Sequence, residues 1–269
     1  MAYPPAAFNY GTNYNSFSPR PDFVEVDMDE DDGTKIDPQT SHPAISFSER
    51  SIRHAFIRKV YLILLAQLSV TFGFATLALL EPSVKAFLAE NTVLVLVLGL
   101  LGFPIIIALF CCGLARVTPW NYLLLGVFTL SVSLMVGTIV GAYTVDSVLI
   151  ALGITLLAFA ILTLYACQTK TDFTVCGGVL LVALSIFFVA GIIFMFFPSF
   201  ANAKLTQIIY GSIGALIFSV YIIYDTQLIM GGHKYQLGPE DYIFGAMALY
   251  LDIINLFLNI LRVVGAARQ

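Results

Sequence analysis

Long apolar stretches separated by short polar breaks make up the chain from about residue 60 onward. The hydrocarbon core of a bilayer is about 30 Å thick, so a helix rising 1.5 Å per residue needs about 20 apolar residues to cross it. Seven stretches of roughly this length predict seven transmembrane helices, and we expect an all-α integral membrane protein. The stretches fall at about 60–80, 92–112, 121–142, 147–167, 176–197, 207–230 and 242–264.

The part before the first stretch has a different pattern. Residues 1–45 combine Pro, Asn, Ser and an acidic run at 29–32 with few aliphatic side chains, which predicts a disordered tail. The sequence from Ser46 to Glu49 matches a capping box, and Ile52 and Phe56 then recur at helical spacing among basic residues. We therefore divide the chain into an acidic tail at 1–45, a basic interfacial helix at 46–59 and a seven-helix membrane domain at 60–265.

Composition and charge agree with this division. Hydrophobic residues make up 59% of the chain and charged residues 11%, about half the charged share of an ordinary soluble domain. Basic residues near span ends are retained in the cytosol, and a cytosolic N-terminus places seven of them on that side against four on the other. This asymmetry predicts a cytosolic N-terminus. The seven are Arg50, Arg53, Arg58, Lys59, Arg116, Lys170 and Lys234, and the four are Lys85, Lys204, Arg262 and Arg268.

Asp225 and Asp252 are the two acidic residues that lie clearly inside predicted spans. A carboxylate in the hydrocarbon region costs several kcal/mol, so it normally faces the bundle interior and has a partner. Small and polar residues share a helix face with each aspartate, so we expect these two faces to meet each other or to meet neighbouring helices. If the two carboxyl groups come close, they would share a proton, because repulsion and desolvation both disfavour double ionisation. The faces comprise Gly211, Gly214, Tyr221 and Asp225 on the sixth span, and Gly245, Ala248, Asp252, Asn255 and Asn259 on the seventh.

Such a pair suits a proton-controlled cation gate, a proton-coupled transporter or an intramembrane aspartyl protease, and a buried interhelical hydrogen bond without further function is the plain alternative. Presenilin-type proteases carry Gly-x-Gly-Asp at the second aspartate and a following Pro-Ala-Leu. Here Leu249, Tyr250 and Leu251 precede Asp252, and no proline occurs after Pro239. We therefore do not expect an enzyme.

Four strings, in this order and spacing, make the chain from about Ser48 to Gly265 resemble the Lifeguard branch of the transmembrane Bax-inhibitor-motif family. They are Phe56 to Tyr61 entering the first span, Tyr221 to Gln227 in the sixth, Glu240 to Tyr242 at the start of the seventh, and Ala248 to Phe257 within it. The resemblance implies a bundle whose last helix is central and wrapped by the other six. It also implies a pH-sensitive calcium leak from internal stores and a role in restraining apoptosis.

The same resemblance assigns roles to particular residues. Asp225 and Asp252 match the family's proton-sharing aspartates that close the pore on the cytosolic side, and Arg116 is the candidate for an arginine latch to Asp225. Tyr221, Asn255 and Asn259 are expected on the pore or interhelical polar face. Calcium commonly takes six to eight oxygen ligands, so two aspartates would hold it only weakly and transiently. That suits a leak better than a sensor.

The expected partners are the lipid bilayer, Ca²⁺ as the permeant ion, H⁺, and other membrane proteins of the apoptosis machinery. No cofactor and no nucleic acid are expected. Endomembranes, the ER or Golgi, are the expected location, with the plasma membrane as the alternative. Two rival functions remain open: a membrane interaction protein that conducts nothing, and a proton-coupled cation antiporter.

Overall fold

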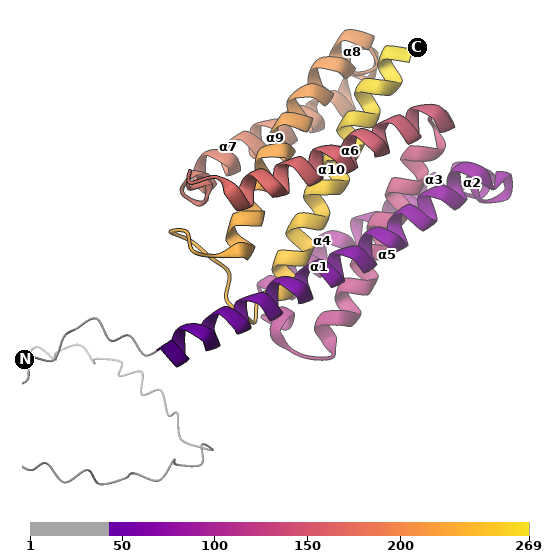
Figure 1. Ribbon diagram of the computed structural model, residues 1–269. Coiled ribbons are helices and arrows are strands. Elements are labelled where there is room, and N and C mark those ends of the chain that lie inside the picture. Colours follow the sequence, from indigo (N-terminus) through magenta and orange to yellow (C-terminus); the bar gives the residue numbers. More distant parts are fainter. Residues whose placement is uncertain (1–42, 269) are drawn as a thin grey trace, which may run out of the picture. The chain divides into compact units, whose positions relative to one another are not determined.

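A computed structural model describes residues 43–268, apart from the side chains of 43–49, Leu96 and Phe110. These residues form ten α-helices and two short 3-10 helices (η), with no strand among them (Figure 1). The helices are α1 Pro43–Leu80, α2 Pro82–Glu90, α3 Thr92–Leu100, α4 Gly102–Phe110, η1 Leu114–Arg116, α5 Trp120–Gly141, α6 Val145–Gln168, η2 Phe173–Cys176, α7 Gly177–Phe196, α8 Pro198–Ala201, α9 Lys204–Met230 and α10 Tyr242–Arg268.

The prediction of seven membrane spans is confirmed, since seven helical segments are long and apolar enough to cross a bilayer. The second span is two helices, α3 and α4, because Pro104 has no N–H to donate to the carbonyl of Leu100 and the helical bonding breaks near Leu101. The break at Glu81 is followed by an additional helix, α2, which starts with Pro82 in the first turn.

The expected interfacial helix and the first span form one uninterrupted helix, α1, which begins at Pro43. Residues 43–45 are therefore helical rather than part of a disordered tail. The rest of that predicted tail, residues 1–42, and the side chains of the Ser46 capping box lie outside the described residues.

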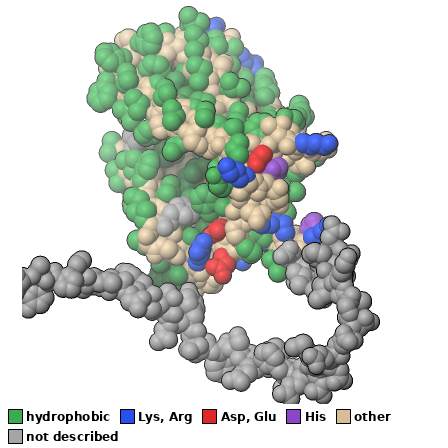
Figure 2. Space-filling view, turned by 90° about the vertical axis from the view of Figure 1, so that its left-hand side faces the viewer, with side chains coloured by type: hydrophobic (Ala, Val, Ile, Leu, Met, Phe, Trp, Pro, Cys, Tyr) green, Lys and Arg blue, Asp and Glu red, His purple; other side chains and the backbone are tan. Residues whose placement is uncertain are grey.

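Because consecutive spans run in opposite directions, their connections lie at two ends. The N-terminal end of the bundle holds the start of α1 and segments 111–119, 169–172 and 231–241. The C-terminal end of the bundle holds segments 81–91, 142–144 and 197–203 and the end of α10. In the view of Figure 2, many of the charged side chains gather at the N-terminal end, while apolar side chains cover most of the remaining face.

The spans differ sharply in how much of them the protein covers. In the most apolar 18-residue window of α10, 67% of residues are buried, against 6% in the span that contains α7. Helix α10 packs against α1, α5, α6 and α9, and Figure 1 shows α10 running between the α1–α5 side and the α6–α9 side. A central position with all six other spans around it stays a prediction.

Candidate functional site

The two intramembrane aspartates meet at the α9–α10 contact. Asp225 on α9 is 7% exposed and Asp252 on α10 is 5% exposed, and their carboxyl groups lie within hydrogen-bonding reach of each other. We call Asp225 and Asp252 the carboxyl pair. The two polar faces thus meet each other, which is one of the two arrangements that the sequence left open.

Small residues on α9 allow the close approach that this contact needs. A Cβ atom added at Gly211 would lie 2.9 Å from the backbone oxygen of Asn259 and 2.8 Å from Cγ2 of Val263. One at Gly214 would collide with the Asn259 side chain and come within 2.6 Å of the Phe187 ring. Because a backbone atom cannot be moved aside as a side chain can, Gly211 sets how closely α9 and α10 approach.

A cavity of about 700 Å³ opens beside the carboxyl pair, between α4, α7, α9 and α10. Most of its lining is apolar, and the polar groups that reach it include both aspartates, Tyr221, Tyr224 and Asn255. We call it the membrane cavity. Its remaining lining residues are Phe103, Leu184, Ser185, Phe188, Phe218, Leu228, Phe244, Ala248 and Leu251.

The electrostatics of the carboxyl pair follow from what surrounds it. Among residues 50–268, no Lys, Arg or His side chain lies within ion-pairing distance of Asp225 or Asp252. The Oδ2 atom of Asp252 is buried and accepts no hydrogen bond from another described group. Two ionised carboxylates would repel each other here, whereas one shared proton turns the contact into a hydrogen bond. The arrangement can therefore exist in discrete protonation states.

Arg116 does not reach the carboxyl pair in this structure. Its guanidinium forms an ion pair with Asp241, with Nη2 2.7 Å and Nε 3.1 Å from Oδ1. These hydrogen bonds from Arg116 to Asp241 raise the pKa of the guanidinium above its ordinary value. Asp241 lies just before α10 at the N-terminal end of the bundle, where the pair stays partly hydrated, whereas Asp225 is buried. The expected latch from Arg116 to Asp225 is thus not formed here, and Arg116 pairs with Asp241 instead.

The other expected polar residues divide between the membrane cavity and the helix interface. Tyr221 and Asn255 line the membrane cavity, and Asn255 Nδ2 donates to its own helix at Leu251 O, 2.8 Å away. Asn259 is buried against Gly214 and donates to Asn255 O at 2.8 Å. Each amide uses one of its two N–H donors within α10, so its second N–H and its oxygen atom are left for interhelical or cavity contacts.

The hydrogen bonds that hold segment 231–241, which follows α9 and leads into α10, were not predicted from the sequence. Arg53 Nη1 donates to Leu237 O at 2.9 Å and to Ile229 O at 3.4 Å. Gly231 and Gly232, with φ of 73° and 80°, make the turn out of α9. The two glycines after α9 were a usable sign of a turn, but nothing in the sequence links Arg53 to residues 176 and 184 positions away.

Asp172, the residue just before η2, also holds segment 231–241 in place. Its Oδ2 atom accepts from the Lys234 N–H at 3.0 Å, and its Oδ1 atom lies 3.8 Å from His233 Nδ1. Hydrogen bonds from the Thr174 hydroxyl and from the Lys234 backbone hold the pKa of Asp172 below its ordinary value. Segment 231–241, which connects α9 and α10, is therefore held by Arg53 of α1 and by Asp172.

A second polar cluster, also missed, joins α1, α5 and α10. The Thr71 hydroxyl lies 2.8 Å from Tyr250 Oη and 2.9 Å from Ser133 Oγ, and Gln67 Nε2 donates to Thr129 Oγ1 at 3.1 Å. All five side chains are buried. We call these residues the hydroxyl cluster.

For a bound metal ion the described residues offer few ligands. No group of three or more His, Cys, Asp or Glu side chains in the described part of the chain is placed to hold one. Two aspartates supply fewer oxygens than calcium normally takes, so the carboxyl pair fits brief, partly hydrated contact with a cation.

Comparison with known proteins gives concordant matches. The family model described as "Inhibitor of apoptosis-promoting Bax1" matches residues 53–269. Protein lifeguard 3 of Homo sapiens is 36% identical over 220 residues, covering 81% of this chain and 71% of that protein. Protein lifeguard 3 of Mus musculus is 34% identical over 221 residues, covering 82% and 72%. Protein lifeguard 4 of Mus musculus is 40% identical over 219 residues, covering 81% and 87%.

Proposed function

Because the chain belongs to the Lifeguard branch of the transmembrane Bax-inhibitor-motif family, we propose that it restrains apoptosis from within a membrane as a proton-regulated calcium leak. We place it in the ER or Golgi membrane with its N-terminus in the cytosol. The basic residues that favour this orientation lie at the N-terminal end of the bundle. Calcium leaving an internal store would then pass toward that end.

The observation that carries the proposal is the carboxyl pair beside the membrane cavity. Buried acids without cationic partners are costly, and they are retained in membrane proteins chiefly where protons or ions move. A stability role alone would be served better by hydroxyl or amide groups, which the hydroxyl cluster uses elsewhere in this bundle. The oxygen atoms of Asp225 and Asp252 are the natural cation contacts of this cavity.

The proposed cycle uses the protonation state of the pair. With one shared proton, the hydrogen bond between Asp225 and Asp252 holds α9 against α10 and keeps the route closed. Loss of that proton removes the bond and leaves two carboxylates that repel each other, and the two helices then favour a second arrangement. Segment 231–241 connects these helices, so its attachment to Arg53 and Asp172 would move with the change.

The test is calcium flux from liposomes that contain only the purified full chain. We expect passive Ca²⁺ efflux that varies with pH, and loss of that variation in the double variant Asp225→Asn, Asp252→Asn. The matched control is Asp146→Asn, because the Asp146 side chain is 73% exposed at the C-terminal end of the bundle. Absence of flux at every pH would overturn the leak and favour an interaction protein. Flux that stops when the proton gradient is dissipated would instead identify an antiporter.

A further inference from the structure

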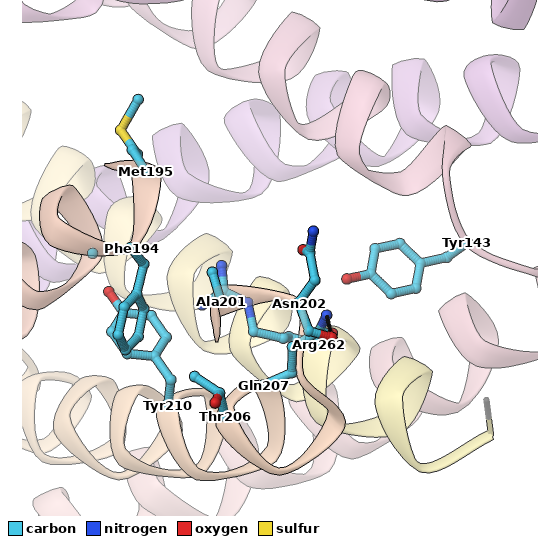
Figure 3. Close-up of a pocket in the computed structure, with 10 residues that line it drawn as sticks. Tyr143, Phe194, Met195, Ala201, Asn202, Thr206, Gln207, Tyr210 and Arg262 are labelled. Carbon is cyan, nitrogen blue, oxygen red and sulfur yellow. Dashed lines mark hydrogen bonds between the residues drawn. The ribbon is translucent and has the colours of Figure 1, made fainter. Parts of the chain in front are cut away.

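A second cavity, of about 350 Å³, lies at the C-terminal end of the bundle and surrounds Arg262 (Figure 3). Its walls come from α7, α8, α9 and α10, together with Tyr143 from the α5–α6 turn. We call it the Arg262 cavity. It shares no lining residue with the membrane cavity, so it belongs to a different part of the molecule.

Arg262 is a half-buried cation with no acidic partner in the described part of the chain. Its guanidinium carbon lies 4.9 Å from the centre of the Tyr210 ring, and the group also reaches the Tyr210 hydroxyl. No carboxylate of residues 50–268 lies within ion-pairing distance of it. The nearby basic residue Arg268 differs, because it pairs with Asp146 at 3.4 Å. An arginine carries five N–H donors, so most of those on Arg262 are left for a ligand.

The position of the guanidinium is fixed by an aromatic platform. The Tyr210 ring stacks on Phe187 with centroids 4.2 Å apart, and the Tyr210 hydroxyl donates to Phe187 O at 3.0 Å. A guanidinium held against a rigid ring loses little conformational freedom when it binds an anion. The platform therefore prepares Arg262 for a ligand that accepts hydrogen bonds.

Around Arg262 the cavity offers further donors of the kind that bind phosphate oxygens. Asn202, Thr206 and Gln207 line one side, and Figure 3 shows the Tyr143 hydroxyl directed toward Asn202 from the other. Gln207 Nε2 also donates to Asn202 O at 3.3 Å, which holds this wall together. No carboxylate lines the cavity, so nothing in its wall repels an anion.

We propose that the Arg262 cavity binds a phosphate group, with an anionic phospholipid as its source. Arg262 lies six residues before the end of α10, roughly 9 Å along the helix, so it is close to the end of the last span, where lipid headgroups are expected. Met195, also part of the lining, is 78% exposed and offers apolar surface for an acyl chain. Arginine binds phosphate through two parallel hydrogen bonds, which lysine cannot reproduce.

The test compares three probes on the purified full chain in detergent, with thermal unfolding and native mass spectrometry as readouts. Dioctanoyl phosphatidic acid carries both phosphate and tails, dioctanoylglycerol carries the tails alone, and glycerol 3-phosphate carries the phosphate alone. We expect phosphatidic acid to bind and to raise the melting temperature progressively as its concentration increases above the dissociation constant. Dioctanoylglycerol should do neither. An equal effect of glycerol 3-phosphate would support the phosphate site and assign it a soluble ligand.

Variants then locate the effect. Arg262→Gln should raise the concentration of phosphatidic acid needed for half-saturation by about tenfold or more, and Arg262→Lys should recover only part of that loss. Arg268→Gln is the matched control, since it removes a positive charge at the same end without touching the cavity. Gln207→Ala removes a wall donor and keeps the Tyr210 platform, which provides a second variant if Arg262→Gln does not fold. Equal binding by the wild type and both cavity variants would overturn the proposal, as would equal stabilisation by dioctanoylglycerol.

Discussion

Two faces of α10 use buried polar groups in opposite ways. On one face, Tyr250 is fully buried and its hydroxyl lies 2.8 Å from Thr71, which in turn contacts Ser133 at 2.9 Å. On the other, Asp252 meets a second acid beside a cavity, and its Oδ2 atom accepts no hydrogen bond from another described group. The two residues are only two positions apart, which places them about 200° apart around the helix.

The difference teaches which buried polar groups serve packing and which serve another purpose. The hydroxyl groups of the hydroxyl cluster are hydrogen-bonded, so they cost little and fix helix positions, although the Oε1 atom of Gln67 in the same cluster is buried without a partner among the described groups. An acid that is buried without a cation reduces stability in every ionised state. We therefore expect substitutions on the two faces to separate stability from pH response.

The largest contrast should appear in the pH dependence of calcium flux. In Asp252→Asn, the amide always donates to Asp225, as a permanently protonated partner would, so the proton can no longer control the contact. We expect the wild-type flux to change about tenfold for each pH unit over which one proton controls the pair, and the variant to respond by less than about twofold. Liposome efflux measured across this range checks the prediction. Tyr250→Phe is the control, and it should keep the wild-type pH response.

A second substitution acts on the spacing of α9 and α10 rather than on the acids. Gly211→Ala would press a methyl group onto Asn259 O and Val263, and overpacking of this kind costs about 1–3 kcal/mol. Gly153→Ala in α6 is the control, because a Cβ there meets no atom within 4 Å. Gly153→Ala should stabilise the protein by about 0.5–1 kcal/mol. The free energy of unfolding in detergent distinguishes the two variants, and equal stability of both would mean that Gly211 does not set the distance between α9 and α10.

On the hydroxyl face, Thr71→Val should affect stability alone. The substitution preserves shape but leaves Tyr250 Oη without its Thr71 contact and removes one contact of Ser133, at a cost of about 1–2 kcal/mol. The same unfolding assay measures this loss. A changed pH response of calcium flux in Thr71→Val would contradict the division between the two faces.

Some of these features could be predicted from the sequence and others could not, for physical reasons. The seven spans and the polar faces that carry Asp225 and Asp252 were predictable, because hydropathy and helical periodicity are local properties of the chain, whereas the helix that each face would meet was not. The hydroxyl cluster was not, because Thr71 and Ser133 also have the local option of bonding their own helices, as both do here. The partner of Arg116 depended on the path of segment 231–241, which brings Asp241 close and is itself held by distant residues. Loop paths of this kind have no periodic signal.

The smallest effect is expected at Asp172, which lies at the N-terminal end of the bundle and on neither face of α10. Its pKa is held below the ordinary value of 3.8, mainly by the hydrogen bond from the Thr174 hydroxyl and to a smaller extent by the one from the Lys234 N–H. A carboxyl with a lowered pKa stabilises the native state above its ordinary pKa, and that contribution is lost as the pH falls through the lowered value. Near neutral pH, Asp172 is therefore ionised and holds Lys234 in place, and a pH change in that range leaves this contact intact.

We accordingly expect Asp172→Asn to loosen segment 231–241 while leaving the pH response of calcium flux near neutrality unchanged. Hydrogen exchange should show faster exchange of the Lys234 and Tyr235 amides in the variant, by less than about fivefold because the site is partly exposed. Asp146→Asn should leave these amides unaffected. If Asp172→Asn instead abolished the pH response near neutrality, proton control would lie in the loop attachment at the N-terminal end of the bundle and not in the carboxyl pair.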